Sequence, residues 1–144
     1  MNQDAHHELE EGLRLQLDFQ KLSAISRHQN AVVPVVVQDM ESREVLILAY
    51  ANAEALSESL RQKKAVFWST SRQELWVKGA TSGSALELVE VRVNCEQNSL
   101  LYLVRAPRGA CHTKDGTGSY RHSCYYRSLG ESTTADLCFT AERI

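Results

Sequence analysis

The sequence predicts a single α+β domain built mainly on antiparallel sheet with one main helix. Three observations support this fold class. The 144 residues suffice for one domain of ordinary size. From residue 32 onward, short β-branched and apolar runs alternate with polar turns, as in antiparallel sheets. One longer segment, residues 53–62, carries the spacing of an amphipathic helix.

Composition excludes several classes of protein. Hydrophobic residues make up 43% of the chain and charged residues 24%, which is typical of a globular protein. The net charge of -2 argues against binding nucleic acid by bulk charge. No apolar run approaches the roughly 18 residues that span a bilayer, and the polar, acidic N-terminus lacks the pattern of a signal peptide. We therefore expect a cytoplasmic protein with no nucleic-acid or membrane partner.

Residues 1–31 form an N-terminal lead-in that we expect to belong to the same fold. A short helix is predicted around residues 5–11 and a loop over 23–30. Between them, apolar residues alternate with polar ones, which predicts one half-buried strand. The apolar positions of that strand are Leu13, Leu15, Leu17 and Phe19.

Residues 32–144 form the main domain, without a visible boundary or repeat. Strands are predicted at 32–38 and 45–50 as a hairpin, then at 65–69, 75–78, 86–95 and 100–104. With the N-terminal strand these give roughly seven strands, and we expect the rest of the domain to be rich in loops. Asn52 is a plausible N-cap for the helix at 53–62. Its inner face would comprise Ala55, Leu56, Ser59 and Leu60.

The four cysteines suggest metal chemistry, although no CxxC pair is present. If Cys95, Cys111 and Cys124 met in space, they would form a three-thiolate zinc site with one open position. An open position is typical of catalytic zinc, because it can hold a water molecule that the metal acidifies. The alternative is that each cysteine is a small buried hydrophobic residue. We interpret Cys138 as a residue that packs in the fold or belongs to the tail of the chain.

His112 follows Cys111 directly and could move a proton beside a metal site. It could equally be a surface or hydrogen-bonded loop histidine, which is the interpretation we prefer for His122. A polar cluster over residues 69–83 could bind phosphate through cations, hydroxyls and backbone N–H groups, or could be an ordinary polar turn. Its residues include Arg72, Trp76, Lys78, Thr81, Ser82 and Gly83.

Asn94, Glu96 and Asn98 alternate around Cys95. On an extended chain, side chains at i, i+2 and i+4 share a face, so these three could ligate a hard cation. A polar turn between two strands explains them equally well.

Taken in order, these segments resemble the phosphoribosyl-AMP cyclohydrolases, which open the adenine ring in histidine biosynthesis. The resemblance covers about two-thirds of the chain and is specific through its combination of motifs. The segments that carry it are VVPVVVQD (32–39), VLILAYANAEAL (45–56), FWSTSRQELWVKGATSG (67–83), VRVNCEQNSLLYLV (91–104), ACHT (110–113) and SCYYR (123–127).

The resemblance implies a homodimer that binds a small nucleotide substrate and one zinc ion per subunit. Cys95, Cys111 and Cys124 match the family's zinc cysteines, with sites assembled from both chains. Water activated by zinc would attack C6 of the purine and break the N1–C6 bond, with His112 as the base. Arg72, Lys78 and residues 81–83 become candidates for the phosphates. Either Trp76 or Trp68 could stack on the base.

The chain departs from the family pattern at two places. The family usually has three aspartates that hold magnesium where this chain has Asn94, Glu96 and Asn98. The gap between the last two cysteines is also longer, with the insertion falling within residues 114–123. No segment resembles the pyrophosphohydrolase fused to some relatives. Two alternatives therefore stay open: hydrolysis of another purine-like nucleotide, and a non-catalytic zinc-stabilised dimer that binds a nucleotide or a protein.

Overall fold

The fold is described from a computed structural model that covers residues 2–28, 31–79, 85–130 and 136–140. Within them lie three helices and eight strands, in an α+β arrangement. The helices are α1 (Gln3–Glu11), α2 (Lys21–Arg27) and α3 (Ala53–Gln62). The strands are β1 (Val33–Asp39), β2 (Val45–Ala51), β3 (Val66–Ser69), β4 (Glu74–Val77), β5 (Glu87–Val93), β6 (Leu100–Arg105), β7 (Arg127–Leu129) and β8 (Leu137–Phe139).

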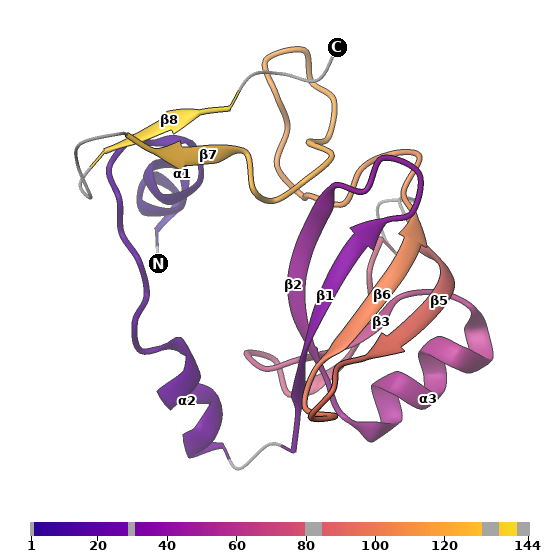
Figure 1. Ribbon diagram of the computed structural model, residues 1–144. Coiled ribbons are helices and arrows are strands. Elements are labelled where there is room, and N and C mark those ends of the chain that lie inside the picture. The colour runs from indigo at the N-terminus through magenta and orange to yellow at the C-terminus, as the bar shows by residue number, and fades with distance from the viewer. Residues whose placement is uncertain (1, 29–30, 80–84, 131–135, 141–144) are drawn as a thin grey trace.

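A four-stranded sheet with the order β2-β1-β6-β5 forms the centre of the fold (Figure 1). Strand β1 runs antiparallel to β2 but parallel to β6, and β5 returns antiparallel to β6. The pairs β3–β4 and β7–β8 are separate antiparallel hairpins. Among the described strands, the pairing is thus mainly antiparallel, as the sequence predicts.

The hydrophobic core lies between the central sheet, the β3–β4 hairpin and α3. Alternate β1 residues, such as Val35 and Val37, are fully buried, and Phe67 stacks on Tyr102 with ring centroids 5.8 Å apart. Helix α3 packs on β3 and β2. The Asn52 side chain caps it by accepting a 2.8 Å hydrogen bond from the Ala55 N–H. Leu60, predicted on the inner face, is 57% exposed, so that part of the prediction is wrong.

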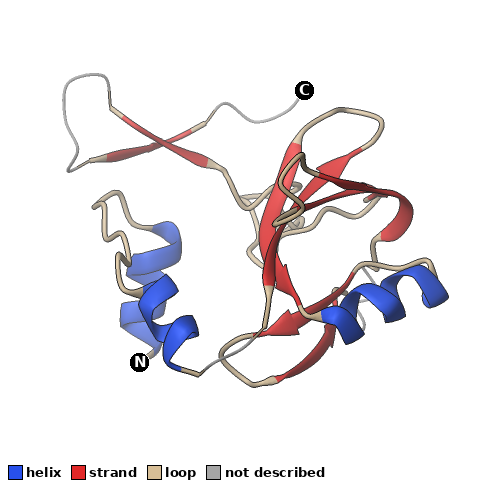
Figure 2. Cartoon of the chain, turned by 60° about the horizontal axis from the view of Figure 1, so that its bottom comes forward, coloured by secondary structure: helices blue, strands red, loops and turns tan. Residues whose placement is uncertain are grey.

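The predicted strand over residues 13–19 does not form. Between α1 and α2 the only β pairing among described residues is an isolated bridge of Arg14 with Asp136. Leu17 and Phe19 are 61% and 83% exposed. This segment runs beside the domain, away from the central sheet (Figures 1 and 2). An alternating pattern needs a long partner strand and a core face to form a buried strand, and among the described residues this segment has only the bridge at Arg14.

Two further elements differ from the predictions. Residues 23–30 were expected to be a loop, but α2 occupies Lys21–Arg27 with only Ile25 buried. The β7–β8 hairpin forms in a region that was predicted to be loop. The sequence does not indicate it, because three-residue strands are too short to give a periodic signal. Helix α1 lies beside this hairpin in Figure 1. Within the described ranges, no helix is both long and apolar enough to cross a membrane.

Candidate active site

Cys111 and Cys124 are brought together by the loop that follows β6. Ala110 donates a backbone hydrogen bond to His122, and Cys111 donates one to Arg121. These bonds form a short ladder in which the chain doubles back on itself. The Cys124 N–H then donates to the carbonyl of Leu46 at 2.8 Å, which fixes the returning arm to β2.

Gly109 permits the close approach of the two arms of this loop. Its φ is +82°, and a Cβ at this position would lie 2.8 Å from the carbonyl oxygen of Arg121. The residues between the two cysteines extend to a far tip, where Lys114 bridges Tyr120. The two cysteines therefore stay adjacent at the base of this hairpin.

The two thiols are close enough for each to shift the pKa of the other. A hydrogen bond from the Cys124 thiol is the main influence that lowers the pKa of Cys111, to about 5. Thr113 adds to this effect, with its Oγ1 2.9 Å from the Cys111 sulfur and its N–H at 3.4 Å. The same contact, together with burial, raises the pKa of Cys124. The contact between the two thiols thus favours the thiolate form of Cys111, which is the form that ligates a metal.

Cys95 lies elsewhere in the chain. It follows β5, at one edge of the central sheet, while Cys124 is fixed to β2 at the opposite edge. Within the described part of a single chain, no three His, Cys, Asp or Glu side chains are arranged so that they could hold a metal ion. One chain thus brings together Cys111 and Cys124 but not Cys95.

A pocket of about 500 Å³ brings together several predicted site residues from two distant segments. The β3–β4 hairpin supplies the two cations and a tryptophan, and the loop after β6 supplies a histidine and a thiol. The contributing side chains are Arg72, Trp76, Lys78, His112 and Cys124. Burial is the main influence that lowers the pKa of Lys78, while the two nearby thiols oppose that effect.

The aromatic wall of the pocket is anchored in the core. Trp76 packs against Phe67 with ring centroids 5.6 Å apart, and the Lys78 ammonium lies 5.3 Å from the centroid of the Trp76 ring. Trp68 is not among the residues that line this pocket. The remaining members of the predicted phosphate cluster, Thr81, Ser82 and Gly83, lie outside the described residues.

The candidate magnesium residues form a hydrogen-bonded turn rather than an extended face. The Asn94 amide donates to the Asn98 side chain at 2.6 Å, and the Asn98 amide donates to Glu96 at 3.2 Å. The Asn94 side-chain oxygen also accepts from the Asn98 and Ser99 backbone N–H groups. All three prospective ligands are therefore hydrogen-bonded to one another, and Asn94 is also bonded to the backbone of the turn.

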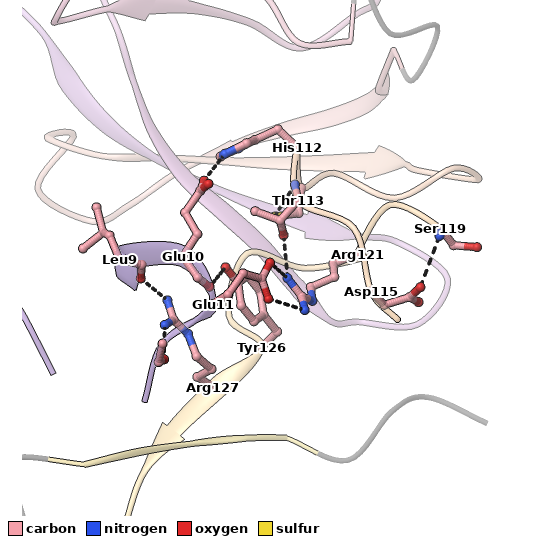
Figure 3. A network of polar contacts seen from close by, with 12 residues as sticks. Leu9, Glu10, Glu11, His112, Thr113, Asp115, Ser119, Arg121, Tyr126 and Arg127 are labelled. Carbon is pink, nitrogen blue, oxygen red and sulfur yellow. Dashed lines mark hydrogen bonds and ion pairs between the residues drawn. The ribbon is translucent and has the colours of Figure 1, made fainter. Parts of the chain in front are cut away.

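The histidines of the loop have different partners. His122 lies 2.9 Å from an Asp39 oxygen and 3.7 Å from a Glu44 oxygen. His112 contacts Glu10 of α1, a pairing that sequence analysis did not find (Figure 3). Because 102 positions separate these two residues, no local pattern could have indicated the contact. Cys138 is exposed on β8, 3.9 Å from the Ser128 hydroxyl.

A comparison with known families gives a decisive match. The family profile described as phosphoribosyl-AMP cyclohydrolase matches residues 47–126, more than half of the chain. The chain belongs to the phosphoribosyl-AMP cyclohydrolase family. The matched range includes all three candidate zinc cysteines and His112, but not α1.

Curated relatives agree with the family assignment. A phosphoribosyl-AMP cyclohydrolase of Chloroherpeton thalassium is 37% identical over 133 residues, covering 89% of this chain and 91% of the relative. One from Archaeoglobus fulgidus is 46% identical over 101 residues, covering 70% of this chain and 88% of the relative. A histidine biosynthesis bifunctional protein of Thermus thermophilus is 45% identical, covering 85% of this chain and 54% of that longer protein. Family membership makes this protein a hydrolase.

Proposed function

We propose that this protein hydrolyses the N1–C6 bond of the purine ring of 1-(5-phosphoribosyl)-AMP in histidine biosynthesis. The observation that carries the proposal is the pocket in which two cations, a tryptophan, His112 and the Cys124 thiol meet. Cations suit the substrate's phosphates, an aromatic ring suits its base, and a histidine suits proton transfer. These groups come from two distant segments of a chain whose family has this activity.

The donor set supports a zinc ion as the cofactor, one per subunit. Two adjacent thiols, with the pKa of Cys111 lowered by its neighbour, match the ligands that zinc prefers. Because Cys95 lies at the opposite edge of its own sheet, we propose that it joins the Cys111–Cys124 pair of a second chain in a homodimer. When bound, zinc supplies a Lewis acid that makes hydroxide available near neutral pH. Thiolate ligands require a reducing compartment, which supports the cytoplasm as the location.

The residues of the pocket then have separate roles. Arg72 and Lys78 hold the phosphates, and Trp76 presents its ring to the base. His112 accepts a proton from the attacking water as the bond to C6 forms. The N1–C6 bond then breaks and N1 takes up a proton, so that the purine ring opens.

The proposal includes magnesium only as a weakly bound ion. A site with one carboxylate and two hydrogen-bonded amides lacks the charge that three aspartates would supply. We propose that magnesium binds mainly with help from the substrate's phosphate oxygens. Because this turn departs from the family pattern, the same zinc chemistry on another purine-like nucleotide is the second candidate function.

The test is ultraviolet absorbance while 1-(5-phosphoribosyl)-AMP is mixed with purified, zinc-loaded protein, because ring opening changes the chromophore. We expect turnover by the wild type and a loss of roughly 10²–10⁴-fold in His112→Ala, with zinc and fold retained. His122→Ala tests the next candidate for the base. Absence of turnover by the zinc-loaded wild type would exclude this substrate, and full activity of His112→Ala would reassign the base.

A further inference from the structure

We propose that the N-terminal helix α1 is part of the active site and that its Glu10 positions His112 for proton transfer. The carboxylate of Glu10 contacts Nε2 of His112 (Figure 3). Glu10 lies outside the residues that match the family profile, and it belongs to a segment with no predicted role. The inference rests on the proposed role of His112 and adds a residue to it.

The contact lies between two cavities. His112 lines the candidate substrate pocket with Lys78 and Cys124, and it also lines a second hollow on the α1 side with Glu10 and Glu11. The imidazole thus forms part of the wall between them. One ring nitrogen is engaged by Glu10, which leaves the other for the reaction.

Helix α1 is held in place by contacts at its C-terminal end. The helix has no basic residue in its own last turn. Arg127 supplies that charge by donating to the carbonyls of Gly12 at 2.8 Å and Leu9 at 3.0 Å. The Tyr126 hydroxyl donates to the Glu10 carbonyl at 2.7 Å. The backbone that carries Glu10 is therefore fixed to the segment that follows Cys124.

A second anchor comes from the inserted loop. Arg121 donates to both carboxylate oxygens of Glu11, at 2.7 and 2.9 Å, and also to the Thr113 hydroxyl at 3.1 Å. Its guanidinium lies 4.2 Å from the centroid of the Tyr126 ring, and its side chain is only 14% exposed. Bidentate arginine–carboxylate pairs fix geometry as well as supply energy. Glu10 and Glu11, which are consecutive in α1, thus contact His112 and Arg121 in the loop that follows β6.

This arrangement determines the tautomer and the orientation of His112. A carboxylate can only accept a hydrogen bond, so in the neutral imidazole Nε2 carries the proton and Nδ1 holds the free lone pair. Nδ1 is then the atom that receives the proton from the attacking water, while the Nε2–H stays directed at Glu10. Among the described residues, Glu10 is the one hydrogen-bonding side chain that contacts the His112 ring, which is 73% exposed, so losing Glu10 removes the contact that fixes its rotamer.

The test compares Glu10→Gln with Glu8→Gln, which removes a carboxylate from the same helix, in zinc-loaded full-length protein. We expect Glu10→Gln to lower kcat roughly tenfold, less than loss of the base itself, while KM, zinc content and thermal stability stay unchanged. Glu10→Asp, which keeps the carboxylate, should recover part of the loss. Glu8→Gln should match the wild type.

Two further measurements separate positioning from a structural effect. In the His112→Ala background, Glu10→Gln should have no additional effect on kcat, because the two residues act as one unit. Nitrogen-15 NMR of the imidazole should show the Nε2–H tautomer of His112 in the wild type and a mixture in Glu10→Gln. The NMR readout needs no substrate.

The outcomes distinguish this inference from the proposed function. If the wild type turns over the substrate and His112→Ala does not, but Glu10→Gln equals the wild type in kcat and tautomer, the inference is overturned while the proposed function stands. If the wild type does not turn over the substrate, the proposed function is wrong. The tautomer measurement still decides whether Glu10 positions His112.

Discussion

At the residue scale, Ser59 shows how one buried hydroxyl connects three elements. Its Oγ donates to the Ala55 carbonyl at 2.8 Å within α3 and accepts from the Val66 N–H at 3.0 Å on β3. The Tyr102 hydroxyl of β6 donates to it at 3.2 Å. Ser59 is fully buried, so water cannot replace these bonds.

We predict that Ser59→Ala lowers the free energy of unfolding by about 1–3 kcal/mol, because the Val66 N–H and the Tyr102 hydroxyl lose a buried partner. Urea denaturation followed by circular dichroism is the measurement. Ser57→Ala is the control, since Ser57 is exposed on the same helix. Equal stability of the two variants would show that the buried bonds do not contribute.

The turn of Asn94, Glu96 and Asn98 leads to a second residue-scale prediction. We expect the free protein to leave this site without magnesium at sub-millimolar concentration, because neutral amides bind hard cations poorly. Any magnesium effect should appear in the apparent affinity for substrate. Calorimetric titration of magnesium into zinc-loaded protein without substrate is the measurement. A tight stoichiometric site that Glu96→Gln abolishes would contradict this prediction.

At the element scale, α1 depends on side chains from distant parts of the chain. It buries no residue of its own, and its described contacts are mainly polar. The hydrogen bond from Arg121 is the main influence that lowers the pKa of Glu11 below its ordinary value of 4.5. A carboxyl with a lowered folded pKa stabilises the docked helix above its ordinary pKa, and this contribution is lost as pH falls through the folded value.

We therefore predict that Glu11→Gln loosens α1 at neutral pH but has no effect under acid conditions below the carboxyl range. A partly exposed pair contributes up to about 1 kcal/mol, so α1 amides should exchange roughly fivefold faster at pH 7. Hydrogen exchange read by mass spectrometry, corrected for intrinsic rates, is the measurement. Exchange in Glu11→Gln that equals the wild type at pH 7 would show that the pair does not hold the helix.

At the scale of the whole molecule, the zinc site needs two chains if Cys95 is a ligand. We predict about one zinc per chain in a homodimer, and loss of zinc in both Cys95→Ser and Cys124→Ser. A heterodimer of these two variants would combine an intact Cys95 with an intact Cys111–Cys124 pair. This heterodimer, purified through a different tag on each chain, should bind one zinc ion per dimer.

Elemental analysis and light scattering are the measurements for this prediction. Cys138→Ser is the control, because Cys138 is exposed on the β7–β8 hairpin. A zinc-loaded, active monomer at micromolar concentration would exclude the shared site. Retention of zinc by Cys95→Ser would show that Cys95 is not a ligand.

Local sequence patterns by themselves determined much of the fold. Short β-branched and apolar runs between polar turns predicted β1 to β6, and Asn52 followed by an amphipathic segment predicted α3, because these signals come from neighbouring residues. They also marked out the cysteines, the histidine and the polar hairpin as candidates for chemistry. The alternating residues 13–19 show the limit of this reasoning, since the same pattern without a partner strand leaves Phe19 exposed.

Only the tertiary structure decided which of these residues meet. Lys78 reaches Cys124 because the β3–β4 hairpin and the loop after β6 border the same pocket, and Cys95 is separated from both by the strand order. Glu10 meets His112 because Arg121 and Arg127 hold α1 against the loop that follows β6. Such contacts depend on the complementarity of surfaces far apart in the chain, and no periodicity within one segment encodes them.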